Sequence, residues 1–178
     1  MKLPVLALMF GLFLSASSYL SASTLLSLRE LRTEYLRMTP AQHILLQNAH
    51  NRGKPFDLGY TLAAIAWRES QAGLININIF DPSCGPFHNN LNSVFARHNY
   101  EDTRYKKNAV CQKLITNFDF AAAEGLAELE YWVSVHDGNL RKTWASYNAG
   151  WNYDSRIGKM YAEMIARRIT ILKEFIKE

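Results

Sequence analysis

Apolar side chains recur at helical spacing along most of the chain that follows residue 24. Leu28, Leu31 and Tyr35 lie three or four residues apart, which predicts a helix from about Leu25 to Arg37. Thr39 can cap a second helix, with a capping box completed by a glutamine three residues later. The pattern therefore predicts two successive helices in the first third of the chain, the second ending near residue 53.

A third helix is predicted to begin near Asp57 and to stop at Gly73. One face of it carries residues at positions i, i+3, i+4 and i+7, namely Leu62, Ile65, Ala66 and Glu69. A carboxylate thus lies on the apolar side of this helix.

The period changes after this helix. Leu74 to Ile79 alternates isoleucine with asparagine, which predicts a short extended piece, and Asp81 to Pro86 is typical of tight turns. Asn89 to Asn108 is polar and poorly periodic, so we expect an irregular surface loop there.

Helical spacing returns at Val110 and continues to the end of the chain. The expected elements are a helix from Asp119 to about Val135, a turn at Asp137–Asn139, a short helix from Leu140 to Tyr147 and a last helix from about Arg156 to Lys177. The sequence therefore predicts a mainly α, single-domain fold with a long irregular loop insertion after the helix that bears Glu69.

The first residues have the layout of a secretory signal peptide. Met1 and Lys2 give a short positive start, Leu3 to Leu14 is apolar, and Ser15 to Ser23 is mostly small and polar. We expect residues 1–23 to be a signal peptide and residues 24–178 to be an exported domain, periplasmic or secreted, with no stable membrane span after cleavage. An uncleaved anchor is the alternative.

Export would place the two cysteines in a compartment where a disulfide can form. Cys84 and Cys111 allow one intramolecular disulfide in an oxidising compartment, and it would close a loop of about 27 residues. The alternative is a pair of free, buried thiols.

Neither the net charge nor the spacing of the histidines points to a particular ligand. The net charge of +4 is a modest excess spread along the chain, which would suit an acidic polymer such as a cell wall or nucleic acid but selects neither. The chain has no real basic cluster, and we expect no nucleic-acid partner. The five histidines show no metal-ligand spacing, so we expect no metal site.

Glu69 is the first candidate for chemistry. Burial on an apolar face disfavours an ionised carboxylate, so its pKa should rise and it could hold a proton near neutral pH. A general acid needs that property. Most helix glutamates are solvated or paired, and that is the alternative interpretation.

Three segments together carry a family resemblance. They are Ala66-Trp67-Arg68-Glu69-Ser70, Ser83-Cys84-Gly85-Pro86-Phe87-His88 and Ala145-Ser146-Tyr147-Asn148-Ala149-Gly150. In this order they resemble the soluble lytic transglycosylases, relatives of goose-type lysozyme that cut bacterial peptidoglycan. The resemblance covers roughly Leu58 to Tyr161, and the Tyr147–Gly150 segment is its most specific part.

The resemblance implies a role for each matching residue. Glu69 would be the single catalytic acid and then the base, and Ser70 would hold a substrate group beside the anomeric centre. Tyr147 and Asn148 would line the cleft, with the tyrosine hydroxyl orienting the Glu69 carboxyl. Tyr161 would lie against the same glutamate. Core packing and helix termination are the alternative roles.

The second segment departs from the family pattern. Gly85 matches, but Pro86, Phe87 and His88 replace leucine, methionine and glutamine. Phe87 keeps an apolar wall and His88 keeps a hydrogen-bonding tip, so a sugar subsite is still expected. Because histidine titrates where glutamine does not, the pH profile could differ from that of the family.

The resemblance implies a lysozyme-like fold and a lytic transglycosylase without a cofactor. Its substrate would be the glycan strands of peptidoglycan, and its product would carry a 1,6-anhydro-muramyl end. One alternative is a hydrolytic muramidase with Asp81 as the base that activates water. Another is a non-catalytic peptidoglycan-binding component of an envelope assembly. Trp67, Trp144 and Trp151 are candidates to stack on sugars, with packing as the alternative.

Overall fold

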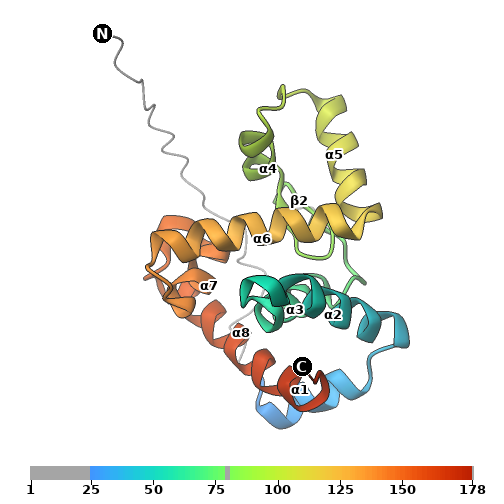
Figure 1. Cartoon of the computed structure of the whole chain (residues 1–178), viewed down its shortest axis with the longest axis vertical. Coiled ribbons are helices and arrows are strands. Elements are labelled where there is room, and N and C mark those ends of the chain that lie inside the picture. Colours follow the sequence, from blue (N-terminus) through green and yellow to red (C-terminus); the bar gives the residue numbers. More distant parts are fainter. Residues whose placement is uncertain (1–24, 79–80, 178) are drawn as a thin grey trace.

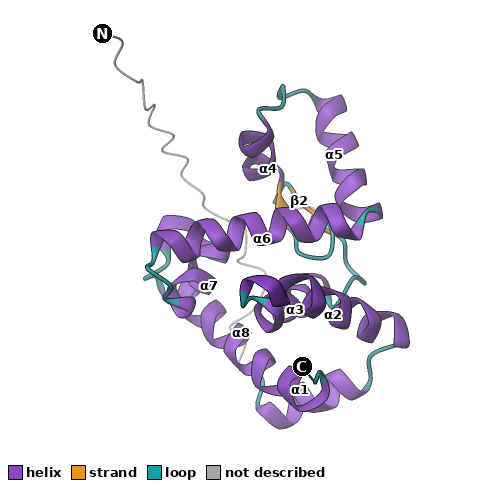
Figure 2. Cartoon of the chain, viewed as in Figure 1, coloured by secondary structure: helices purple, strands orange, loops and turns teal. Residues whose placement is uncertain are grey.

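The computed structural model describes residues 25–78 and 81–177 and is mainly helical, as predicted (Figure 2). Its elements are α1 (Leu28–Leu36), α2 (Pro40–Gly53), η2 (Lys54–Phe56), α3 (Gly59–Ser70), β1 (Ile77–Asn78), β2 (Ser83–Cys84), β3 (Asn89–Asn90), α4 (Leu91–His98), α5 (Arg104–Thr116), α6 (Phe118–Val135), α7 (Leu140–Ala149), η3 (Gly150–Asn152) and α8 (Arg156–Phe175). The predicted signal peptide, residues 1–23, lies outside the described residues.

Helix α3 lies at the centre of the core. It packs against α2 and α8 and also contacts α6. Figure 1 shows α6 running between the α4–α5 pair and the part of the molecule formed by α2, α3 and α8. Leu62 and Ile65 of α3 are completely buried, and Ala63 and Ala64 are too small to keep the neighbouring helices apart. This burial on all sides fixes the position of the C-terminal end of α3.

Local signals set the helix ends where the sequence indicated them most clearly. The Thr39 hydroxyl accepts a hydrogen bond from the Gln42 amide, and the Gln42 side chain bonds the Thr39 amide in return. This capping box and Pro40 start α2 as predicted. Helix α6 differs slightly, because Asn117 rather than Asp119 caps it.

The chain reverses sharply after α3. Gln71, Ala72 and Gly73 all have positive φ angles, which turn the backbone away from the helix axis. A three-stranded antiparallel sheet follows in the order β1-β2-β3, with Ile77 opposite Cys84 and Cys84 opposite Asn89. The predicted extended piece is present in part, as β1, and turns flank β2 within the segment predicted to be tight turns.

The expectation of an irregular loop across residues 89–108 is wrong for most of that range. The structure places α4 and the start of α5 there. The Asn90 side chain caps α4, and Leu91, Val94 and Phe95 bury one face of this helix. One apolar stripe on an eight-residue helix is too short to stand out from the polar residues around it.

The predicted disulfide is confirmed. Cys84 of β2 is bonded to Cys111 of α5, and their Cα atoms are 5.4 Å apart. The next residue, Gly85, has a φ of +80°, and a Cβ there would lie 2.5 Å from the carbonyl oxygen of Leu114. Only glycine lets the backbone approach α5 this closely.

Within the described part of the chain, none of the helices combines the length and the apolar character that crossing a membrane requires.

Reduction of the disulfide should loosen the α4–α5 region first. The bond closes a loop of 27 residues, for which the expected contribution to the free energy of unfolding is about 3 kcal/mol. Limited proteolysis followed by mass spectrometry should therefore give the first cuts between Ser83 and Val110 in reductant. A Cys84→Ser/Cys111→Ser double variant should give the same cuts without reductant. Identical digestion of oxidised and reduced protein would contradict this expectation.

Candidate active site

Glu69 is the penultimate residue of α3, at the point where the central helix leaves the core. Its side chain is 18% exposed, whereas Leu62, Ile65 and Ala66 on the same face are fully buried. The carboxylate therefore lies at the edge of the core, neither sealed within it nor free in solvent.

Burial does not decide the protonation of Glu69. Burial raises the pKa of its carboxyl, but four opposing effects outweigh it: a hydrogen bond from His88, the positive charges of Arg68 and of protonated His88, and an interaction with the Tyr161 hydroxyl. The pKa of Glu69 consequently falls below its ordinary value of 4.5. The predicted rise is wrong, because the sequence indicates the burial of a side chain but not its partners.

His88 is the direct partner of Glu69. Its Nδ1 atom lies 3.4 Å from Glu69 Oε2, and its side chain is only 10% exposed. Burial lowers the pKa of the imidazole, but the Glu69 hydrogen bond and charge, the Ile75 carbonyl and the charge of Asp81 together raise it above 6.5. These opposite shifts favour the ionised form of Glu69 and the protonated form of His88.

Two tyrosines from different helices border the carboxylate. Tyr161 of α8 is 2% exposed. Its hydroxyl makes no hydrogen bond of ordinary length among the described residues, yet it is close enough to Glu69 for the two groups to shift each other's pKa. Burial, followed by the charge of Glu69, raises the pKa of both Tyr161 and Tyr147 well above the ordinary value. Both hydroxyls therefore stay neutral and can donate.

Tyr147 does not bond Glu69 as predicted. Its hydroxyl donates to the carbonyl oxygen of Phe87 at 2.9 Å. Ser70 likewise does not face a ligand, because it is fully buried. Its Oγ lies 2.7 Å from the Pro86 carbonyl oxygen and accepts a hydrogen bond from the Gly73 amide at 2.8 Å. Tyr147 and Ser70 thus hold the 85–88 loop against α3.

The remaining predicted site residues are divided between core and surface. Phe87 is fully buried and packs against Phe118, with ring centroids 5.8 Å apart, so it is not placed to form the wall of an open subsite. Gly85 is buried against α5. Asn148 is exposed on α7. The structure therefore brings together Glu69, His88, Tyr147 and Tyr161, and places Ser70, Gly85 and Phe87 behind them as support.

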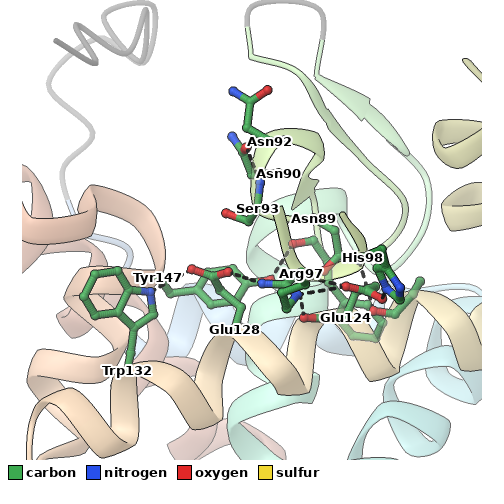
Figure 3. Close-up of polar contacts among 12 residues, drawn as sticks. Asn89, Asn90, Asn92, Ser93, Arg97, His98, Glu124, Glu128, Trp132 and Tyr147 are labelled. Atoms are coloured by element: carbon green, nitrogen blue, oxygen red, sulfur yellow. Dashed lines mark hydrogen bonds and ion pairs between the residues drawn. The ribbon is translucent and has the colours of Figure 1, made fainter. Parts of the chain in front are cut away.

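A polar network that the sequence did not reveal adjoins Tyr147 (Figure 3). Arg97 of α4 bonds Glu124 at 3.0 Å and Glu128 at 2.7 Å, both on α6. Glu128 also accepts a hydrogen bond from the Trp132 indole at 2.8 Å, and Glu124 bonds His98. The charges of Glu128 and Arg97 act on the pKa of Tyr147. The i, i+4 spacing of the two glutamates was visible in the sequence, but their partners on α4 were not.

The tryptophans differ in exposure. Trp67 and Trp144 are buried and donate to Glu34 and Thr61, so they are packing residues. Trp151 of η3 is 69% exposed, and its ring meets Trp132 edge-on at a centroid distance of 5.1 Å. Only Trp151 of these three candidates has a free face.

Three other features bear on the chemistry. Asp81, the predicted alternative base, accepts a hydrogen bond from the Asn90 side chain at 3.2 Å. Among the residues that the structure describes, no three His, Cys, Asp or Glu side chains gather closely enough to hold a metal ion. A hollow of about 800 Å³ between α1 and the turn after α3 borders Gln71 and Leu74, but not Glu69.

No family model matches the sequence, and no solved structure matches it at a significant level. The chain is 31% identical over 133 residues to a protein of Enterobacteria phage T4, described as an uncharacterized 20.7 kDa protein in the vs-regB intergenic region. The alignment covers 71% of this chain and 67% of the phage protein. The two chains therefore belong to one family.

Removal of the Ser70 hydroxyl should weaken the fold. In a Ser70→Ala variant the buried Pro86 carbonyl and the Gly73 amide each lose a partner, so the free energy of unfolding should fall by about 1–3 kcal/mol. Urea denaturation measures this change, and Ser134→Ala, at an exposed position of α6, is the control. Unchanged stability together with weaker ligand binding would instead restore the predicted substrate contact.

Proposed function

We propose that this member of the phage T4 protein's family is a lytic transglycosylase. It cleaves the β-1,4 bond between N-acetylmuramic acid and N-acetylglucosamine in peptidoglycan, with Glu69 as the only acid and base. One observation carries the proposal: a carboxylate that is 18% exposed at the end of a buried helix pairs with a histidine and interacts electrostatically with two neutral tyrosines.

The mutual contacts of the three resembling segments support this proposal. Ser70, from the first segment, bonds the carbonyl of Pro86 in the second. Tyr147, from the third, bonds the carbonyl of Phe87, 60 residues away in sequence. Segments that are distant in the chain thus meet around one carboxylate, as a shared catalytic role requires.

The chemistry needs one protein carboxyl. Glu69 gives a proton to the glycosidic oxygen as the bond from that oxygen to C1 of the muramyl residue breaks. The muramyl C6 hydroxyl then bonds to C1, and its proton returns to Glu69. The products are a free hydroxyl on the departing sugar and a 1,6-anhydro-muramyl end. No water and no cofactor enters the balance.

A hydrolytic muramidase is the second candidate. Such an enzyme needs a base to activate water, and Asp81 is close enough to act on the pKa of His88. Asp81 accepts a hydrogen bond from the Asn90 side chain, whereas the single-carboxylate reaction needs no second carboxylate. A non-catalytic wall-binding component is the third candidate.

Export of the domain is part of the proposal. The signal-like first residues indicate it, and the Cys84–Cys111 disulfide fits an oxidising compartment such as the periplasm. The expected partner is the glycan strand itself, with an envelope assembly as a further possible partner.

Glu69→Gln should abolish cleavage while leaving the fold and wall binding intact. Loss of general acid catalysis should reduce the rate by roughly two to four orders of magnitude. Mass spectrometry of muropeptides released from purified peptidoglycan measures both rate and product. Glu130→Gln, an exposed glutamate of α6, is the matched control and should keep full activity.

The products separate the three candidates. Anhydro ends support the transglycosylase, and reducing ends support the hydrolase. Binding of peptidoglycan without release of fragments, unchanged in Glu69→Gln, supports the binding component. Retention of more than about a tenth of wild-type activity in Glu69→Gln would contradict the assigned role of Glu69.

Trp151→Ala should weaken binding to peptidoglycan without changing the bond that is cut. The Trp151 ring is exposed, is held edge-on by Trp132, and follows the Tyr147–Gly150 segment directly, so a sugar ring can stack on it. Loss of one aromatic contact should weaken affinity roughly 2- to 10-fold. A pull-down with insoluble peptidoglycan measures this, and Tyr105→Ala, at an 82% exposed ring on α5, is the control. Equal retention of both variants would remove Trp151 from the binding surface.

A further inference from the structure

His88 is held through both of its ring nitrogens. Nε2 lies 2.9 Å from the carbonyl oxygen of Ile75, and Nδ1 lies 3.4 Å from Glu69 Oε2. A carbonyl oxygen only accepts hydrogen bonds, so Nε2 must carry a hydrogen. The tautomer of neutral His88 is therefore fixed by the backbone, and the nitrogen without a hydrogen, Nδ1, is the one that lies 3.4 Å from Glu69 Oε2.

This orientation determines how many protons the Glu69–His88 contact needs in order to be attractive. A neutral imidazole facing an ionised carboxylate would place two lone pairs against each other, which is repulsive. One proton between Nδ1 and Oε2 turns the contact into a hydrogen bond. The proton can lie on His88, giving an ion pair, or on Glu69, giving a neutral pair.

We propose that Glu69 and His88 share one proton, and that His88 stores on Nδ1 the proton that Glu69 delivers to the glycosidic oxygen. The sharing is argued from the positions of the two ring nitrogens and does not depend on the proposed function, whereas the delivery rests on it. His88 is a positioning residue in this scheme, because it acts through Glu69 and need not touch the sugar.

The surrounding charges favour storage on His88. Arg68 on α3 stabilises the ionised form of Glu69, and Asp81 stabilises protonated His88. Tyr161 of α8 and Tyr147 of α7 stay neutral. Arg168 of α8 is also within electrostatic range of Glu69, and burial first, then Arg68, lowers its pKa to about 10, so it remains charged at neutral pH.

In this scheme the Glu69–His88 pair holds the same number of protons before and after one turnover. The stored proton moves from Nδ1 to the carboxyl, and the carboxyl gives it to the glycosidic oxygen as the C1–O bond breaks. The C6 hydroxyl bonds to C1 and releases its proton to the carboxylate, which returns it to Nδ1. The glutamine that the transglycosylase family has at this position could hold the loop but could not store a proton.

Nitrogen-15 NMR of the purified protein tests the sharing without any assay of activity. Long-range ¹⁵N–¹H spectra recorded between about pH 4 and 9 report the tautomer and titration of each histidine, and His88→Gln identifies the His88 signals. We expect protonated His88 to persist above pH 6.5 and its neutral form to carry hydrogen on Nε2. In Glu69→Gln the titration should move to lower pH. Hydrogen on Nδ1, or a titration unaffected by Glu69→Gln, would overturn the proposal.

A double-mutant cycle measures the same pair through stability. The pKa of Glu69 is depressed, so its contribution is present above 4.5 and is lost as pH falls through its folded value. The pKa of His88 is raised, so its contribution is present below 6.5 and is lost as pH rises through its folded value. The coupling between Glu69→Gln and His88→Gln should thus be largest between pH 4.5 and 6.5. A coupling that does not vary with pH would contradict the pairing.

Activity profiles test the storage role. We expect His88→Gln to approach wild-type activity in acid, and its activity relative to wild type to fall by roughly tenfold per pH unit as the unaided Glu69 loses its proton. His43→Gln, on α2 and bonded to the Tyr35 carbonyl, is the control and should keep the wild-type profile. Parallel profiles for wild type and His88→Gln would overturn storage. If wild type cleaves no peptidoglycan, the proposed function fails, while the NMR result still decides the sharing.

Discussion

The candidate site depends on how the loop at residues 85–88 is fastened to the end of α3. The Ser70 hydroxyl has one hydrogen, and the shorter of its two carbonyl contacts is to Pro86, at 2.7 Å. The Tyr147 hydroxyl donates to the next carbonyl, that of Phe87. Two successive carbonyls are thereby fixed by donors from two different helices, and His88 follows immediately. Without these bonds the imidazole would lose its place beside Glu69, and only burial, the neighbouring arginine and the Tyr161 hydroxyl would then act on the pKa of the carboxyl.

Glu69 illustrates how partners can reverse the effect of burial. A carboxylate at the edge of an apolar core should hold its proton more tightly than one in water. Here a hydrogen bond and nearby positive charge stabilise the ionised form by more than desolvation destabilises it, and in the proposed scheme the proton moves to His88. The acid in such a site is a property of the pair. Its strength depends on the distance between two side chains from separate elements, and so on the loop that sets that distance.

The sequence predicted what local spacing determines. The capping box at Thr39 and the shared face that ends in Glu69 depend on neighbours within seven residues, and both are present in the structure. The cysteine pairing followed from there being a single possible partner. The roles of Ser70 and Tyr147 could not be read in the same way, because their acceptors lie 16 and 60 residues away. A hydroxyl satisfied by a distant carbonyl and one free to meet a ligand look identical in sequence. The helix at residues 91–98 was missed because its apolar stripe is so short.

Support for the loop extends outward to α5 and α6. Gly85 can approach the Leu114 carbonyl only because it lacks a side chain, and the adjacent disulfide ties β2 to the same helix. Across the molecule, Arg97 links α4 to α6 next to Tyr147. His88 thus lies on a loop whose backbone is fixed from several directions. A rigid backbone allows one side chain to change its chemistry without changing its position. In the proposed scheme, His88 uses that fixed position to carry a proton as well as to hold a hydrogen bond.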